Sequence, residues 1–226
     1  MNFNEHLNLK GSHAVFGASK SSWLRYTQEK MRDAITSQYR VSLGTEIHEF
    51  AASQITLNHK ISNAKHLKQG IENYIYQKYL NEEYNVLSDF GNKLLYHLVD
   101  IPKETFETVK AYINDGIGYR MTPEQVLYFS DLFFGTADSI CFRNNFLRIH
   151  DLKTGTVQAH IEQLEIYAAL FCLEYAIRPG DIEIELRIYQ NNEIVFHNPK
   201  ADEILPIMDK MITDNKYLQK IDYKES

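Results

Sequence analysis

Two aspartates, Asp138 and Asp151, lie in two short strand-like runs that meet at Asn144-Asn145. Asparagine adopts positive φ readily, so this pair suits the two-residue turn of a β-hairpin. Facing residues of such a hairpin have numbers that add up to 289, and Asp138 then faces Asp151. Directly opposed residues have Cβ atoms about 4.5–5.5 Å apart, where two negative charges repel unless a cation neutralises them. The spacing therefore predicts a divalent metal site in which carboxylate oxygens hold Mg²⁺ or Mn²⁺.

Lys153 lies two residues after Asp151 and shares its strand face, because side chains alternate across a strand. An ammonium beside a metal-bound carboxylate can orient or activate a water molecule. The alternative is a salt-bridged surface patch, which is the usual setting of an Asp-x-Lys sequence. The register of the hairpin decides between the two, since a slip of one residue turns every side chain to the other face.

Four further side chains could join such a site. Gln163 and Tyr167 are four residues apart on a helix expected over 159–176, with His160 one turn earlier on the same side. An amide can bond to a phosphate or a metal-bound water, and a tyrosine adds an oriented hydroxyl. His48 lies on an earlier helix, and a neutral imidazole is a metal ligand, although an isolated helical histidine is more often structural.

The elements that must hold these residues follow from the hydrophobic pattern. Apolar positions at helical spacing predict helices over 19–33, from Ser42 or Thr45 through 55, over 64–80 and over 86–99. After Pro123, runs rich in aromatic and β-branched residues predict a three-strand meander, then the helix 159–176, strands 182–190 and 193–197, and a last helix. This order predicts an α/β fold in which helices flank a central mixed β-sheet.

Neither a repeat nor a linker interrupts the chain, which predicts one domain over 1–226. Its expected parts are a helical N-terminal half at about 1–120, a catalytic sheet core at about 121–200 and a C-terminal helix at about 201–217.

Charge and cysteine content exclude some function classes. The 24 Lys+Arg against 30 Asp+Glu argue against a protein that holds nucleic acid by bulk positive charge, although residues 1–80 carry +4 and the remainder −10. Two cysteines are too few for a four-thiolate cluster or a disulfide framework. Without a long apolar run or a signal core, we expect no membrane partner and a cytoplasmic protein.

Four short motifs follow one another along the chain: Gly44-x-x-x-His48, Gly135-x-x-Asp138, Asp151-x-Lys153 and Gln163-x-x-x-Tyr167. In order, spacing and element type, this set resembles the PD-(D/E)XK nuclease superfamily, in the RecB-like branch of CRISPR-associated and phage exonucleases. The resemblance implies a restriction-endonuclease-like core. It also implies that Asp138, Asp151 and the backbone carbonyl of Leu152 coordinate a catalytic metal, with His48 as a ligand or as a support for a second metal.

By the same resemblance, Lys153 positions the attacking water, while Gln163 and Tyr167 contact the DNA backbone or steady the site. The implied activity is that of a Mg²⁺- or Mn²⁺-dependent deoxyribonuclease, an exonuclease acting on DNA ends in recombination, repair or phage DNA processing. Iron-sulfur members of the branch carry an N-terminal cysteine and a C-terminal cysteine cluster, whereas residues 21–26 and the tail after Lys200 contain none. We therefore expect no iron-sulfur cluster.

Two other functions compete with this hypothesis. A DNA-binding or scaffold protein could keep the nuclease fold without turnover. A glycosidase could use Asp138 and Asp151 as its carboxylate pair, but Lys153 beside them and a single tryptophan, Trp23, disfavour that interpretation. The sequence leaves open exonuclease or endonuclease mode, strand polarity, DNA or RNA, a homo-oligomer, and a recombinase or helicase partner in a bacterial or phage-infected cell.

Overall fold

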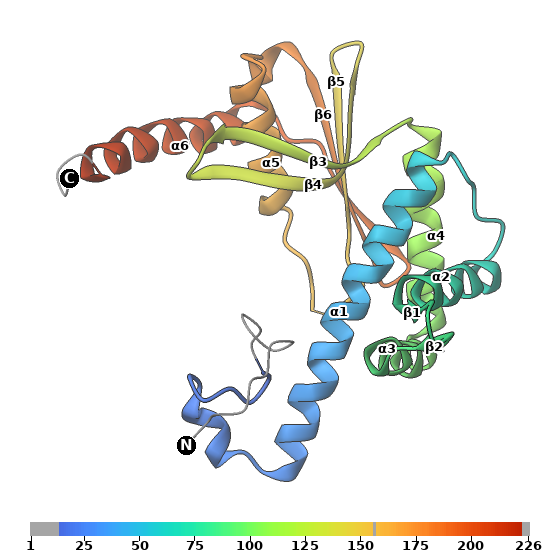
Figure 1. The fold of residues 1–226 in the computed structure, drawn as a ribbon. Helices are drawn as coiled ribbons and strands as arrows, with labels where there is room; N and C mark the ends of the chain where they lie inside the picture. Colours follow the sequence, from blue (N-terminus) through green and yellow to red (C-terminus); the bar gives the residue numbers. More distant parts are fainter. Residues whose placement is uncertain (1–13, 156, 223–226) are drawn as a thin grey trace.

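A computed structural model of the protein describes residues 14–155 and 157–222, so residues 1–13 and 223–226 of the predicted domain lie outside it. Its centre is a five-stranded mixed sheet with the order β3-β4-β5-β6-β7. Only β5 and β6 run parallel, and the other neighbours are antiparallel. Helices flank the sheet, as predicted (Figure 1).

The N-terminal half is helical. A 3-10 helix, Ser21–Arg25, precedes α1 (Gln28–Thr56). There follow α2 (Ala64–Tyr79), the two-residue strands β1 (Leu80–Asn81) and β2 (Val86–Leu87), α3 (Asp89–Val99) and α4 (Lys103–Gly118).

The prediction of two helices within residues 19–55 was wrong, because α1 is continuous. Thr27 starts it, since the Thr27 side chain accepts a hydrogen bond from the backbone N–H of Lys30. The expected second start at Thr45 does not occur. Its hydroxyl donates back to the carbonyl of Val41 at 3.4 Å, which is a bond made within a helix.

The second half contains the predicted sheet. The meander is β3 (Thr122–Ser130), β4 (Phe133–Arg143) and β5 (Phe146–Leu152). The crossover helix α5 (Glu162–Glu174) leads through a short 3-10 turn to β6 (Glu183–Gln190) and β7 (Glu193–His197). Helix α6 (Ala201–Asp222) runs five residues past the predicted end. Helix α5 is shorter than predicted, so His160 lies before it rather than on it.

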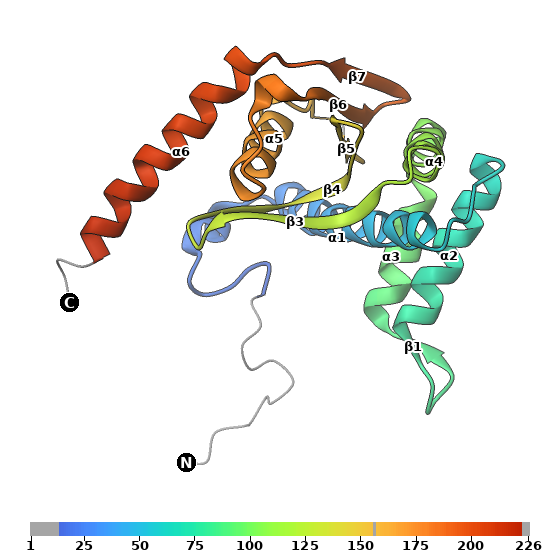
Figure 2. The ribbon, with the colours of Figure 1, turned by 90° about the horizontal axis from the view of Figure 1, so that it is seen from above.

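Two hydrophobic cores lie on the two faces of the sheet. One joins α5 and α6 to β3–β6 and includes Leu147, Ile149 and Leu164. The other joins α1–α4 to the sheet through Leu152 and Tyr189. Figure 2 shows α5 and α6 on one side of the sheet and α4 on the other. None of the described helices combines the length and apolarity needed to cross a membrane.

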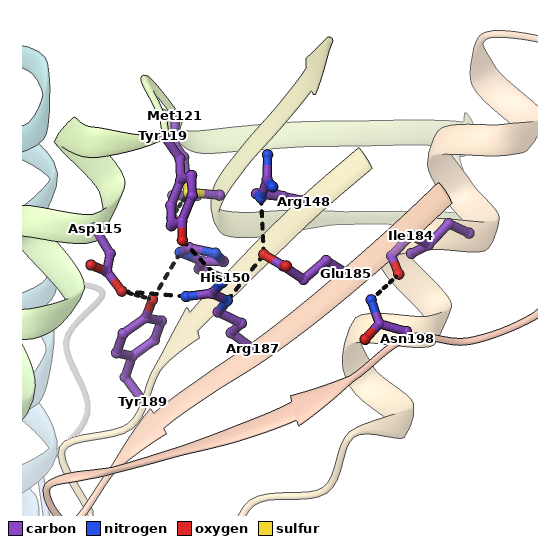
Figure 3. A network of polar contacts seen from close by, with 11 residues as sticks. Asp115, Tyr119, Met121, Arg148, His150, Ile184, Glu185, Arg187, Tyr189 and Asn198 are labelled. Carbon is purple, nitrogen blue, oxygen red and sulfur yellow. Dashed lines mark hydrogen bonds and ion pairs between the residues drawn. The ribbon is translucent and has the colours of Figure 1, made fainter. Parts of the chain in front are cut away.

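A polar network attaches α4 to β5 and β6 (Figure 3). The hydroxyl of Tyr189 donates to Asp115 at 2.7 Å and lies 3.3 Å from Nδ1 of His150. Arg187 reaches Asp115 at 3.5 Å and the hydroxyl of Tyr119 at 3.1 Å. Burial, and then the charges of nearby arginines, lower the pKa of His150 to about 3, so its ring is neutral. The network fixes β5 immediately beside Asp151.

Candidate metal centre

The hairpin that carries both aspartates forms in the predicted register. Asn144 and Asn145 have φ of 51° and 59°, as a two-residue turn requires. Ser139 pairs with His150 and Ile140 with Ile149, which is the predicted sum. The ladder between β4 and β5 ends at Ser139 and His150, so Asp138 and Asp151 are the next facing positions, where the strands separate. Figure 1 shows β3 and β4 crossing β5 and β6 at a steep angle beyond this point.

Asp138 spans the gap where the strands separate. Its Oδ2 accepts a hydrogen bond from the backbone N–H of Leu152 at 2.8 Å. The same oxygen lies 3.4 Å from Nδ1 of His48 on α1. Asp138 thus connects β4 to β5 and to the long helix.

Asp151 is almost fully buried, at 2% exposure. Its Oδ1 accepts a hydrogen bond from Nζ of Lys153 at 3.0 Å. Its Oδ2 is buried and has no hydrogen-bond partner within residues 14–155 and 157–222. A buried carboxylate oxygen without a partner carries a substantial desolvation cost, which a cation would offset.

Burial raises the pKa of both carboxylates in the metal-free protein. Burial, and then the charge of Asp138, raise the pKa of Asp151 to about 6. Burial also raises the pKa of Asp138, while the Leu152 N–H opposes the shift. A bound cation would stabilise the ionised form of two neighbouring carboxyls whose pKa values are raised, so the pair favours cation binding.

His48 is in its metal-binding form. Burial lowers its pKa, so the ring is neutral near pH 7 and can offer a nitrogen lone pair. The charges of Asp151 and then Glu124 are the largest effects that oppose this shift, so both carboxylates act on the His48 ring.

Glu124 on β3 is a member of the site that the sequence did not predict. Ligand atoms of His48, Glu124 and Asp138 all lie within 4.8 Å of one another. Partial burial of its carboxyl group, and then the charge of Asp138, raise the pKa of Glu124. Its backbone has φ of 51°, which is unusual for a residue other than glycine and marks a local departure from strand geometry.

The third and fourth motifs form one hydrogen-bonded chain. Nζ of Lys153 donates to Oε1 of Gln163 at 3.1 Å, and Nε2 of Gln163 donates to the hydroxyl of Tyr167 at 3.1 Å. Both ends of the Gln163 amide are therefore engaged within the site. The side chain of Tyr167 lies against Gly135, where an added Cβ would come within 2.8 Å of the ring.

Gly44 has a similar steric role on α1. A Cβ at Gly44 would lie 3.0 Å from Oγ1 of Thr154, so the helix approaches the segment after β5 closely at this point. Both motif glycines thus allow elements to approach that a side chain would separate.

The assembled site, called the acidic site below, comprises His48, Glu124, Asp138 and Asp151. It borders a cavity of about 450 Å³ on α1 whose lining includes His48, Glu49, Glu124 and Asp138. Its side chains offer three carboxylates and one imidazole. Oxygen-rich sets of this kind suit Mg²⁺ and Mn²⁺, and the unpartnered Oδ2 of Asp151 is a free ligand atom, so the residues fit a divalent metal.

These features define a candidate metal centre on a mixed sheet. The chain belongs to the family described as "Protein of unknown function (DUF2800)", whose model matches residues 13–203 and so spans the whole acidic site. No curated protein and no solved structure matches the chain.

Proposed function

We propose that the protein is a metal-dependent DNA nuclease of the PD-(D/E)XK type that hydrolyses phosphodiester bonds. The observation that carries the proposal is a half-buried Asp138 and a buried Asp151 beside Lys153, with Oδ2 of Asp151 left without a partner among the described residues. An ion pair with Lys153 requires only one carboxylate, whereas binding of a catalytic cation requires more than one.

Asp138, Asp151, Glu124 and His48 would hold Mg²⁺ or Mn²⁺, together with the carbonyl of Leu152. The chemistry supplied by a bound ion is polarisation of the phosphoryl oxygen and a lower pKa for bound water. Positive charge held at this point also allows a protein of net charge −6 to engage a polyanion.

Lys153 is the residue of this chain best arranged to act on the attacking water or the phosphate. An ammonium has three donors, and two of them are engaged with Asp151 and Gln163. The third remains for a substrate oxygen or a water molecule. Gln163 fixes the direction of that donor, and the Tyr167 hydroxyl, which accepts from Gln163, keeps its own proton for a bond to the substrate backbone.

The biological setting that fits this chemistry is trimming of DNA ends in recombination, repair or phage DNA processing, in the cytoplasm of a bacterial or phage-infected cell. A homo-oligomer or a recombinase or helicase partner would supply the grip on DNA that a small acidic domain lacks.

The test is incubation of the protein with linear and circular DNA, labelled separately at each end, in Mg²⁺, Mn²⁺ or EDTA. Metal-dependent degradation that is absent in Lys153→Ala is the expected result. Lys210→Ala, an exposed lysine on α6, is the matched control and should keep full activity. Equal degradation by wild type and Lys153→Ala, or none by wild type in either metal, would refute the proposal.

A further inference from the structure

A second cavity adjoins the acidic site along α1. Its volume is about 560 Å³, and it lies between α1, the junction of α3 and α4, and the segment after β5. The two cavities share Val41, Gly44 and Thr154 in their linings. A molecule in the second cavity would therefore lie next to the cavity that borders the acidic site.

The walls of this second cavity are largely apolar. Val41 and Val157 are 69% and 85% exposed, and Ile101 and Pro102 face them from the junction of α3 and α4. Covering such exposed apolar side chains with a flat apolar group removes apolar area from water, which favours binding of that group.

Polar groups at the same cavity suit the remainder of a nucleotide. Arg40 presents an exposed guanidinium, which is the preferred partner of a phosphate. The imidazole of His97 stacks on Tyr39, with ring centres 5.2 Å apart at 20°, and so is held in a fixed plane. Asp100 adds an acceptor for the amino or imino edge of a base.

We propose that this second cavity binds one unpaired nucleotide next to the scissile phosphate, with its base against Val41 and Val157 and its phosphate on Arg40. This inference rests on the proposed nuclease function and narrows its substrate to single strands or frayed ends. A base stacked within a duplex cannot enter a cavity in the protein, so it must first leave the helix.

The experiment is equilibrium binding of labelled oligonucleotides, followed by fluorescence anisotropy, with Ca²⁺ as the cation and gel electrophoresis to confirm an intact strand. A thymidine strand is compared with a strand of equal length made only of abasic units, and with duplex DNA. We expect the thymidine strand to bind about tenfold more tightly than either, because only an unpaired base covers the apolar wall. Comparing whole strands avoids any assumption about binding register.

Two variants test the cavity itself. Val157→Asp should weaken binding of the thymidine strand about tenfold more than binding of the abasic strand, because the added charge repels both strands whereas only a base contacts that wall. Arg40→Ala should weaken both strands. The controls are Val86→Asp on β2 and Arg32→Ala two turns earlier on α1, both exposed and neither lining the cavity. Val41→Asp is the second variant of the apolar wall, and circular dichroism confirms folding of each protein.

The outcomes separate this inference from the proposed function. Equal affinity for thymidine and abasic strands, or a Val157→Asp variant that binds like Val86→Asp, overturns the nucleotide cavity even if the protein degrades DNA. Tight duplex binding overturns the restriction to unpaired bases. Failure of the cleavage test, with base-dependent binding intact, would instead refute the nuclease while keeping the cavity.

Discussion

Replacement of Asp151 by asparagine should stabilise the metal-free protein while removing its response to metal. Asp151 is buried, and its pKa is raised from an ordinary 3.8 to about 6 by burial and by Asp138. The folded protein therefore binds more protons than the unfolded chain between about pH 4 and 6, and its free energy of unfolding falls as pH rises through this window.

The magnitude follows from the same shift. A pKa change of one corresponds to about 1.4 kcal/mol, so the charged Asp151 costs the metal-free fold about 3 kcal/mol above pH 6. Asparagine removes this cost and keeps an acceptor for Lys153, but it buries an amide donor at about 1–2 kcal/mol. The net gain of about 1–2 kcal/mol corresponds to a rise in Tm of about 2–8 °C for a domain of this size.

The assay is thermal unfolding of wild type and Asp151→Asn in EDTA at pH 8 and pH 4.5, and again with Mn²⁺ at pH 8. Asp209→Asn, an exposed aspartate on α6, controls for the change in net charge. We expect the variant to be more stable only at pH 8, and Mn²⁺ to raise the Tm of wild type and of Asp209→Asn alone. A variant less stable than wild type in EDTA at pH 8, or equally stabilised by Mn²⁺, would contradict the reasoning.

Three further substitutions test other parts of the site. Glu124→Gln should weaken Mn²⁺ binding about tenfold in a thermal-shift titration. The Tm of this variant in EDTA should stay within about 1–2 °C of wild type, because the residue is exposed. Unchanged metal affinity would remove Glu124 from the ligand set. Gly135→Ala places a Cβ 2.8 Å from the Tyr167 ring, so kcat on linear DNA should fall. The control, Ala137→Gly on the same strand β4, should lower Tm without a comparable fall in kcat. Tyr189→Phe removes bonds to Asp115 and His150 and should lower the free energy of unfolding by about 1–3 kcal/mol in urea titration; no change would show that the network contributes nothing to stability.

The hairpin was predictable because its information is local. Asn144-Asn145 sets the turn, the turn sets the register, and the register brings Asp138 and Asp151 together. The succession of the meander, the crossover helix and the last two strands along the chain followed from the hydrophobic pattern in the same way.

Glu124 was not predictable because a bulge lies between it and its turn. A two-residue turn at Asp131-Leu132 would place Gln125 opposite Asp138. The register instead shifts between Tyr128 and Ser130, and Gln125 pairs with Ala137. The local sequence does not indicate that extra residue, so the position of the Glu124 carboxylate at the site could be found only from the structure.

Helix α4 was missed for a different reason. It contains Gly116 and Gly118 and several β-branched residues, which weaken a helical signal. The structure explains Gly116, where a Cβ would lie 2.7 Å from Ile55 of α1. Packing between α1 and α4 therefore determines a residue that intrinsic helix preference disfavours.

The polar network of Figure 3 also supports the acidic site, although its residues are not metal ligands themselves. His150 and Asp151 are consecutive on β5 and point to opposite faces, and Tyr189 pairs with Leu152 while its carbonyl accepts from the N–H of Lys153 at 2.9 Å. The ligand-bearing end of β5 is thus anchored from behind by side chains of α4 and β6. Natural variation at Asp115 or Tyr189 should therefore be tolerated less than their separation from the metal ligands suggests, and homologues that change one of them should carry a compensating change in the other.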